Sequence, residues 1–124
     1  MEGSKRFLYV YTHGVDTPER TATPLYLATT AALSDHEVTI FFTARGSSVL
    51  RRGVAEKIQV KEGGVPLRSF IDQAKEAGVR FVVCAASLEL NDMSREDLIE
   101  EVDEIAGGAA FAEMACEADV VISF

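Results

Sequence analysis

Cysteine and histidine are the residues of this sequence suited to act as nucleophile, acid or base, and each occurs twice. Cys84 ends the apolar run VRFVVC, which is typical of a buried strand, and we expect a short helix to follow at 85–90. Helix N-termini favour negative charge, so a thiolate here is a candidate nucleophile. The alternative is that Cys84 only packs, because free cysteines are among the most frequently buried residues.

The second cysteine and the two histidines lie in other predicted elements. Cys116 falls in an alanine-rich helix predicted over 109–118, and we interpret it as a packing residue. It would serve as a resolving thiol only if it came close to Cys84. His13 follows the first predicted strand, where a histidine can be an acid, a base, a hydrogen-bond donor to a bound anion or an ordinary polar loop residue. His36 lies on the opposite side of the sheet, and we expect it to be exposed.

Glycine and acidic residues near His13 form no known cofactor motif. The segment THGVDTPER contains Gly14 but matches neither the dinucleotide pattern G-x-G-x-x-G nor a P-loop, so nucleotide binding is unsupported. Asp16 and Glu19 are interpreted as a cap and a first-turn acid, with no cluster that would bind a metal. The two cysteines are far apart and form no C-x-x-C, which argues against a disulfide scaffold or a zinc site.

Charged residues gather at two places in the sequence, one basic and one acidic. Basic residues gather at Arg45, Arg51, Arg52 and Lys57. They either attract an anion or an acidic partner or complement a helix C-terminus, and we favour the helix for Arg51 and Arg52. Acidic residues gather between 96 and 104, either as a solvated face or as a docking surface for a partner: Glu96, Asp97, Glu100, Glu101, Asp103 and Glu104.

The overall charge and length restrict the classes of protein to which this chain can belong. The chain has 124 residues, 12 Lys and Arg against 20 Asp and Glu, and a net charge of −8. Such an acidic chain is not expected to bind nucleic acid or anionic membranes, because phosphate contacts need clustered cations. There is no apolar run of ~20 residues for a membrane span, and the N-terminus lacks the layout of a signal peptide. We expect one cytoplasmic domain over residues 1–124.

The apolar pattern predicts strands that alternate with helices. Strands are expected where β-branched and aromatic residues cluster, at 6–11, 37–42, 79–84 and 119–124. Helices are expected at 25–33, 46–53, 66–77, 85–90 and 109–118, with a further short helix capped by Ser94 and Asp97. This order predicts an α/β fold with a mainly parallel sheet. Ligands of such sheets gather at the carboxyl ends of the strands, here 12–14, 43–46 and 84–87.

Two boundaries have alternatives. The first helix begins either at Thr17, with Pro18 in its first position, or at Thr21, with Pro24 in its first turn. Residues 55–65 are predicted as a loop, with or without a brief strand at 58–60.

Taken in order, several segments resemble the DsrE/DsrF-like family of sulfur-relay proteins over nearly the whole chain. They are GVDTPER, EVTIFFTARG, GVRFVVCAASLELNDMSREDLI, GGAAF and ADVVISF. The resemblance implies a three-layer α/β/α fold with a five-stranded, mainly parallel sheet and assembly into trimers or hexamers. It also implies that sulfur is carried as a persulfide between donor and acceptor proteins or small sulfane-sulfur compounds, without metal or organic cofactor.

The resemblance assigns the sulfur-accepting position to Cys84. In relatives that carry sulfur, this cysteine begins a C-x-A or C-x-x-S segment, and here Ala85, Ala86 and Ser87 follow it. We expect His13, Gly14, Ala85 and Ser87 to contribute to substrate binding. The Arg-Arg-Gly of the tRNA-thiolation branch is absent, and residues 91–93 (NDM) occupy that region instead, which argues against tRNA thiolation. The alternatives to sulfur transfer are a non-catalytic subunit of an assembly and a small-ligand sensor.

Overall fold

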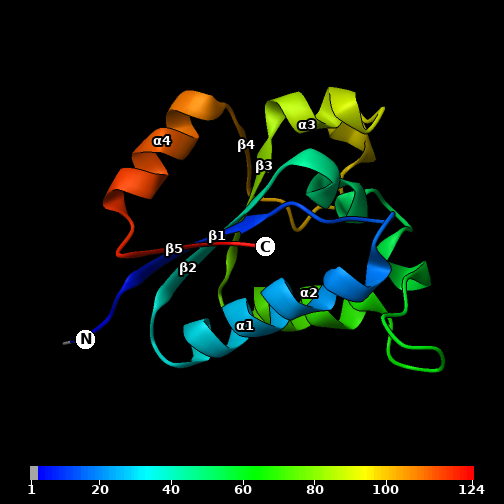
Figure 1. Ribbon diagram of the computed structural model, residues 1–124, viewed down its shortest axis with the longest axis horizontal. Coiled ribbons are helices and arrows are strands. Elements are labelled where there is room, and N and C mark those ends of the chain that lie inside the picture. The colour runs from blue at the N-terminus through cyan, green and yellow to red at the C-terminus, as the bar shows by residue number, and fades with distance from the viewer. Residues whose placement is uncertain (1–2) are drawn as a thin grey trace.

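The computed structural model describes residues 3–124, and its centre is a parallel sheet (Figure 1). Within these residues the sheet has five strands: β1 (Arg6–Tyr11), β2 (Glu37–Phe42), β3 (Arg80–Cys84), β4 (Glu104–Ala106) and β5 (Val120–Ser123). Their order is β4-β3-β2-β1-β5, and every neighbouring pair is parallel. The predicted α/β fold is therefore confirmed.

Helices cover both faces of the sheet, which gives three layers. Helices α1 (Ala22–Leu33) and α2 (Leu67–Glu76) lie on one face, and α3 (Ala85–Leu90) and α4 (Gly108–Glu117) lie on the other (Figure 1). Shorter 3-10 helices complete the connections: η1 (Pro18–Arg20), η2 (Ala44–Leu50), η3 (Ala55–Lys57) and η4 (Arg95–Asp97).

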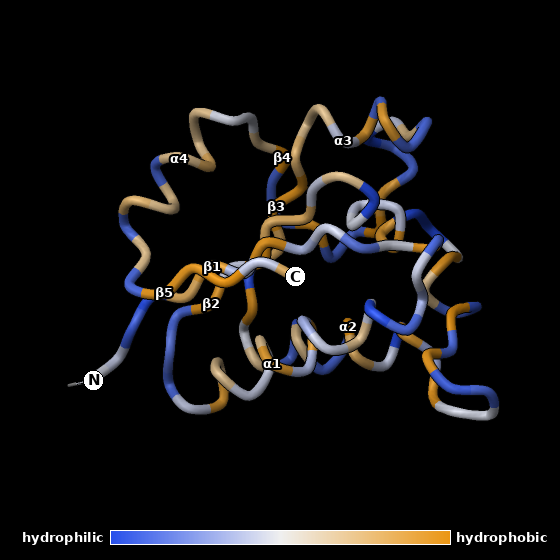
Figure 2. Tube along the Cα trace, in the orientation of Figure 1, coloured by the Kyte–Doolittle hydropathy of each residue, from blue (hydrophilic) through white to orange (hydrophobic). Residues whose placement is uncertain are grey.

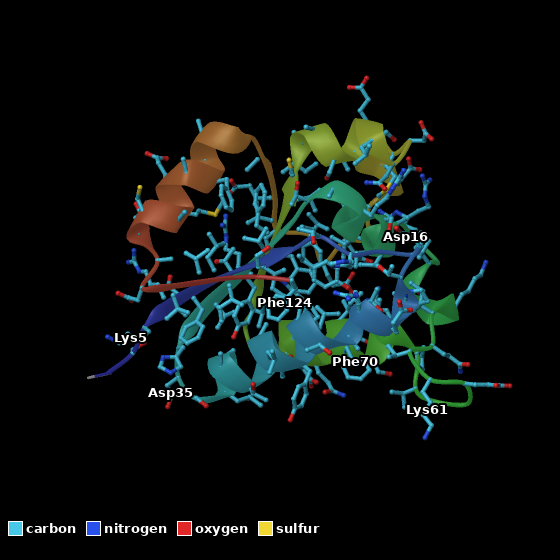
Figure 3. All side chains as sticks on the ribbon, viewed as in Figure 1. Lys5, Asp16, Asp35, Lys61, Phe70 and Phe124 are labelled. Atoms are coloured by element: carbon cyan, nitrogen blue, oxygen red, sulfur yellow. The ribbon has the colours of Figure 1, made fainter. Side chains whose placement is uncertain are left out.

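Each face of the sheet has its own hydrophobic cluster, because successive side chains of a strand point to opposite faces. The larger cluster lies under α1 and α2 and includes the fully buried Phe42, Phe81 and Ile71. The smaller one lies under α4 and consists of Leu8, Phe41, Val82 and Ala106. Figure 2 shows the central strands as the most hydrophobic part of the chain. Side chains fill the space between the layers, whereas Lys61 projects from a loop into solvent (Figure 3).

The two open boundaries have clear outcomes. Residues Pro18–Arg20 form one turn of 3-10 helix, and α1 begins at Ala22 after its N-cap Thr21, as the second alternative predicts. Residues 58–60 form no strand, only an isolated bridge between Gln59 and Pro66. The loop predicted for 55–65 is therefore confirmed for 58–65, whereas Ala55–Lys57 form the 3-10 helix η3.

The short helix predicted at 46–53 is present, but it is a 3-10 helix and spans Ala44–Leu50. The side chain of Ser48 donates a 2.6 Å hydrogen bond to the carbonyl of Arg45. Such side-chain bonds to the local backbone compete with α-helical bonding. Gly53, with a φ of 82°, then turns the chain in a direction that an α-helix cannot follow.

Strand β4 was missing from the predicted strands and begins at Glu104, the last residue of the acidic segment. It has three residues, too few for an alternating pattern to emerge. Its Ala106 is in register with Cys84 of β3. The strand therefore forms the edge of the sheet beside the candidate nucleophile.

Candidate functional site

Cys84 is the last residue of β3, at the carboxyl edge of the sheet where the sequence placed it. It is also the N-cap residue of α3, with an extended backbone. Alternation along the strand turns Val82 and Cys84 toward the same face, and Cys84 packs against the small cluster under α4. Its side chain is half-buried. Cys84 thus has apolar neighbours and keeps part of its surface exposed.

The residues after Cys84 form the turn that the sequence predicted. Ala85 and Ala86 are exposed and carry no bulky side chain that would cover the thiol. Ser87 is buried, and its hydroxyl donates a 2.7 Å hydrogen bond to the carbonyl of Cys84. This bond closes the first turn of α3, so the serine hydroxyl holds the backbone of the cysteine.

His13 lies at the same edge of the sheet but away from Cys84. Strand β2 separates β1 from β3, which places the ends of those two strands about 10 Å apart. His13 is half-buried and lines a cavity of about 220 Å³, whose other lining residues are Glu19, Arg20, Thr23, Pro24 and Phe124. Neither Cys84 nor Ser87 belongs to this lining.

Gly14 is buried between the loops that follow β1 and β2. A Cβ atom there would lie 2.8 Å from the carbonyl carbon of Arg45 and closer still to the carbonyl oxygen. The amide of the next residue, Val15, donates to the hydroxyl of Ser48 at 3.1 Å. Gly14 therefore allows two loops to touch, and its contacts are with the protein itself.

Asn91 is the residue at this edge that sequence reasoning missed. It is the C-cap of α3, and its side-chain amide nitrogen lies within 2.9 Å of the carbonyl of Ala44 and the hydroxyl of Ser47 and 2.7 Å from the carbonyl of Ser87. Its side-chain oxygen accepts a 3.1 Å hydrogen bond from Arg45. The only sequence signal was an asparagine at a predicted helix end, which is common for caps.

The arginines of the basic stretch mostly donate hydrogen bonds to backbone carbonyls of the same chain. Arg51 donates to the carbonyls of Asn91 and Asp92, at 3.1 and 2.9 Å, and Arg52 donates to that of Glu96 at 3.2 Å. The interpretation as a complement to a helix C-terminus is therefore confirmed for Arg51 but not for Arg52, whose partner Glu96 lies inside η4. The helix concerned is α3, which lies elsewhere in the sequence, and not the segment that carries the arginines.

The acidic segment is only partly the solvated face that we expected. Glu101 pairs with Arg68, and Asp103 lies 2.6 Å from the ammonium of Lys75. The backbone amide of Phe81 also donates to Asp103, at 2.8 Å. Partial burial opposes ionisation of Asp103, but these hydrogen bonds and the nearby positive charge outweigh it and lower its pKa.

Cys116 is exposed, so its interpretation as a packing residue is wrong. The side of α4 that packs on the sheet carries other residues: Ala110, Phe111, Met114, Ala115 and Ala118. Helix α4 starts beside β4, and Cys116 is roughly nine residues further on, or about 13 Å along the axis. Within one chain, the thiols of Cys84 and Cys116 are therefore far apart. His36 was also expected to be exposed, but it is half-buried, with its ring 5.0 Å from that of Phe7.

Residues 3–124 contain neither a metal-binding cluster nor a membrane-spanning helix. No group of three or more His, Cys, Asp or Glu residues is arranged to hold a metal ion there. Within the same residues, none of the helices has both the length and the apolar character needed to cross a membrane.

With this geometry, comparison with known proteins defines the family. The chain matches the sequence model of the DsrE/DsrF-like family over residues 5–124, and it belongs to that family. It is 28% identical to a protein named sulfur carrier protein DsrE2 from Allochromatium vinosum, over 80% of this chain and 86% of the relative. It is 27% identical to the uncharacterized protein YrkE of Bacillus subtilis, over 76% and 82% of the two chains.

Solved structures support the fold. The crystal structure of the ychN protein from E. coli has a TM-score of 0.79 and 20% identity, over 97% of this chain and 99% of that one. A protein of unknown function from Methanobacterium thermoautotrophicum has a TM-score of 0.65 and 17% identity, over 98% and 99%. Both likenesses extend over nearly the whole of each chain, which agrees with the three-layer fold.

Proposed function

We propose that this protein is a sulfur-relay protein that accepts sulfane sulfur on Cys84 as a persulfide and passes it to a thiol of a partner. The observation that carries the proposal is the half-buried, solvent-accessible Cys84 at the carboxyl edge of the sheet in a chain of the DsrE/DsrF-like family. Similarity to the sulfur carrier protein DsrE2 of A. vinosum supports a role in sulfur transfer in general.

The chemistry consists of two thiol exchanges. The Cys84 thiolate attacks the outer sulfur of a donor persulfide, forming a new S–S bond while the donor's S–S bond breaks and its thiolate leaves. An acceptor thiolate then attacks the outer sulfur on Cys84, and the Cys84 thiolate leaves. Thiosulfate can replace the donor, with sulfite as the leaving group. Each step moves one sulfur atom and needs no oxidant, metal or organic cofactor.

The surroundings of Cys84 suit a carrier more than a hydrolytic enzyme. Ala85 and Ala86 leave the thiol open to an approaching partner, because neither has a side chain that covers it. The apolar cluster under α4 supports the other side of the sulfur. Ala85 and Ser87 are the proposed neighbours of the bound sulfur. His13 follows β1, whose end lies about 10 Å from that of β3, so it would touch only a partner that spans the edge of the sheet, and Gly14 would act by holding the neighbouring loop.

The partners and setting are part of the proposal. We propose a homo-oligomer, a trimer or hexamer, that covers the carboxyl edge and shields the persulfide, in the cytoplasm. An alternative is a non-catalytic subunit in which Cys84 only packs, and a second is a ligand sensor that uses the cavity beside His13.

Intact-protein mass spectrometry separates these functions. After incubation with thiosulfate or a low-molecular-weight persulfide, wild-type protein and Cys116→Ser should each gain the mass of one sulfur atom, whereas Cys84→Ser should gain none. Addition of a free thiol should then restore the original mass. If Cys84→Ser gained as much sulfur as wild type, or if wild type gained none from either donor, the proposal would be wrong.

A further inference from the structure

The helix that begins at Cys84 cannot hold its position by itself. Helix α3 has six residues, and isolated helices shorter than ~12 residues are marginal in water. Four of its residues are exposed, namely Ala85, Ala86, Glu89 and Leu90. Leu88 packs against the larger hydrophobic cluster, and the polar contacts at the two ends of the helix add to this support.

Asn91 makes those contacts at the far end of α3. Its side-chain amide nitrogen donates to the carbonyl of Ser87 at 2.7 Å and to that of Ala44 at 2.9 Å. Ala44 belongs to the turn after β2, so one side chain ties α3 to the neighbouring loop. Ala44 has a φ of 50°, a conformation uncommon for a residue with a Cβ atom, and its carbonyl faces Asn91 because of it.

A second contact holds Asn91 itself in place. Arg45, from the same turn as Ala44, donates to the Asn91 side-chain oxygen at 3.1 Å and so orients the amide. The hydroxyl of Ser47 also lies 2.9 Å from the amide nitrogen. The nitrogen thus points at oxygen atoms that accept hydrogen bonds, and the oxygen points at a cationic donor. A carboxylate at this position would lose these donations.

The contacts continue from Asn91 to the cysteine. Asn91 binds the carbonyl of Ser87, and the hydroxyl of Ser87 binds the carbonyl of Cys84 at 2.7 Å. A continuous run of hydrogen bonds therefore leads from the C-cap of α3 to the backbone of Cys84. Loss of the Asn91 amide would release one end of this run and let α3 move away from the sheet.

We propose that Asn91 is a positioning residue that holds α3 and so keeps the Cys84 thiol half-buried against the apolar cluster under α4. This inference rests on the proposed function for its biological meaning, because a shielded persulfide survives until the correct thiol arrives. The positioning itself is a property of the free thiol and can be measured without any sulfur donor.

The test compares the two thiols of one chain. Cys84 and Cys116 are alkylated with iodoacetamide, and peptide mass spectrometry gives the rate for each, with the exposed Cys116 as internal reference. In Asn91→Ala the ratio of the Cys84 rate to the Cys116 rate should rise roughly fivefold or more, because local opening of α3 becomes more frequent. Ser87→Ala, which breaks the same run of hydrogen bonds nearer to the cysteine, should raise the ratio in the same direction.

A matched control excludes an effect of lower stability alone. Ile71 of α2 is fully buried in the larger cluster, so Ile71→Val lowers global stability while it leaves the hydrogen bonds of Asn91 and Ser87 in place. Its Cys84-to-Cys116 ratio should equal that of wild type. A wild-type ratio in both Asn91→Ala and Ser87→Ala, or an equal rise in Ile71→Val, would overturn the inference.

The pH dependence and the persulfide add two independent readouts. Alkylation measured from pH 6 to 10 separates a uniform rise, caused by greater access, from a shift in the midpoint, caused by a changed environment of the thiolate. Either change in Asn91→Ala supports positioning, and an unchanged profile contradicts it. If wild type loads sulfur, the persulfide of Asn91→Ala should decay faster. If wild type never loads sulfur, the proposed function fails while the alkylation ratio still decides the role of Asn91.

Discussion

The close contact between the loops after β1 and β2 makes Gly14 sensitive to any added side chain. In Gly14→Ala the new Cβ atom would meet the carbonyl group of Arg45 and the hydroxyl of Ser48, with the carbonyl carbon only 2.8 Å away. Ordinary van der Waals contact for a Cβ atom begins at 3.4 Å. Because one obstacle is backbone and the site is buried, no rotation of a flexible side chain relieves the clash.

The expected cost follows from this geometry. Overpacking of a buried site costs about 1–3 kcal/mol, and a backbone obstacle places Gly14→Ala at the upper end, about 3 kcal/mol. The unfolding entropy of about 2.1 cal/mol/K per residue amounts to about 260 cal/mol/K for 124 residues, so the Tm should fall by about 11 °C. The 3.1 Å bond from the Val15 amide to Ser48 should be weakened at the same time.

Thermal unfolding followed by circular dichroism measures this change. The matched control is Gly108→Ala, at the first position of α4, where a Cβ atom meets nothing within 4 Å. That variant should be neutral or more stable by up to about 1 kcal/mol, because alanine restricts the unfolded chain. A Gly14→Ala protein that melted within about 2 °C of wild type would refute the argument that these loops are in rigid contact.

Three further predictions concern the core and the surface. Ile71→Ala should lower the free energy of unfolding in urea by about 2–5 kcal/mol, because it leaves a cavity among fully buried side chains; a cost below about 1 kcal/mol would contradict this packing. Asp103→Asn should cost about 0.5–1 kcal/mol at pH 7, a value reduced for solvent exposure. Folding lowers the pKa of Asp103, so its contribution to stability is complete above the unfolded pKa of about 4 and is lost as the pH falls through the folded pKa. The stabilities of wild type and Asp103→Asn should therefore converge in acid. A constant difference between them down to pH 2 would contradict the ion pair. Cys116→Ser should change stability by less than about 0.5 kcal/mol, and the wild-type Cys116 should react rapidly with a thiol reagent such as DTNB.

The local pattern of the sequence was a good guide to the strands and to Cys84. Strands β1, β2 and β3 follow the apolar runs, since a strand buried on both faces must be apolar nearly throughout. Strand β5 also lies within its predicted run, although it is an edge strand and mostly exposed. Helix α3 and the capping box at Ser94 and Asp97 also follow local signals, because caps act within one turn. The position of Cys84 at the end of β3 needed nothing beyond these signals.

The features that could not be predicted from the sequence depend on the rotation of helices and on the order of strands. The alanine-rich composition of α4 shows no strong amphipathic stripe, so nothing local indicated that Cys116 faces solvent while Phe111 and Met114 face the sheet. Strand β2 lies between β1 and β3, so His13 and Cys84 end up separated although both follow strands that end at the same edge. Strand order is not encoded by any local pattern.

The sequence by itself determined which segments become strands, where the single candidate nucleophile lies along the chain, and to which family the chain is similar. These depend on side chains within a few residues of one another. The tertiary structure decided that Cys84 is half-buried, that Gly14 is a contact between loops, and that Asn91 ties α3 to the turn after β2. Those properties arise where segments that are distant in the sequence meet, about 40 to 50 residues apart for Asn91 and its partners Ala44 and Arg45.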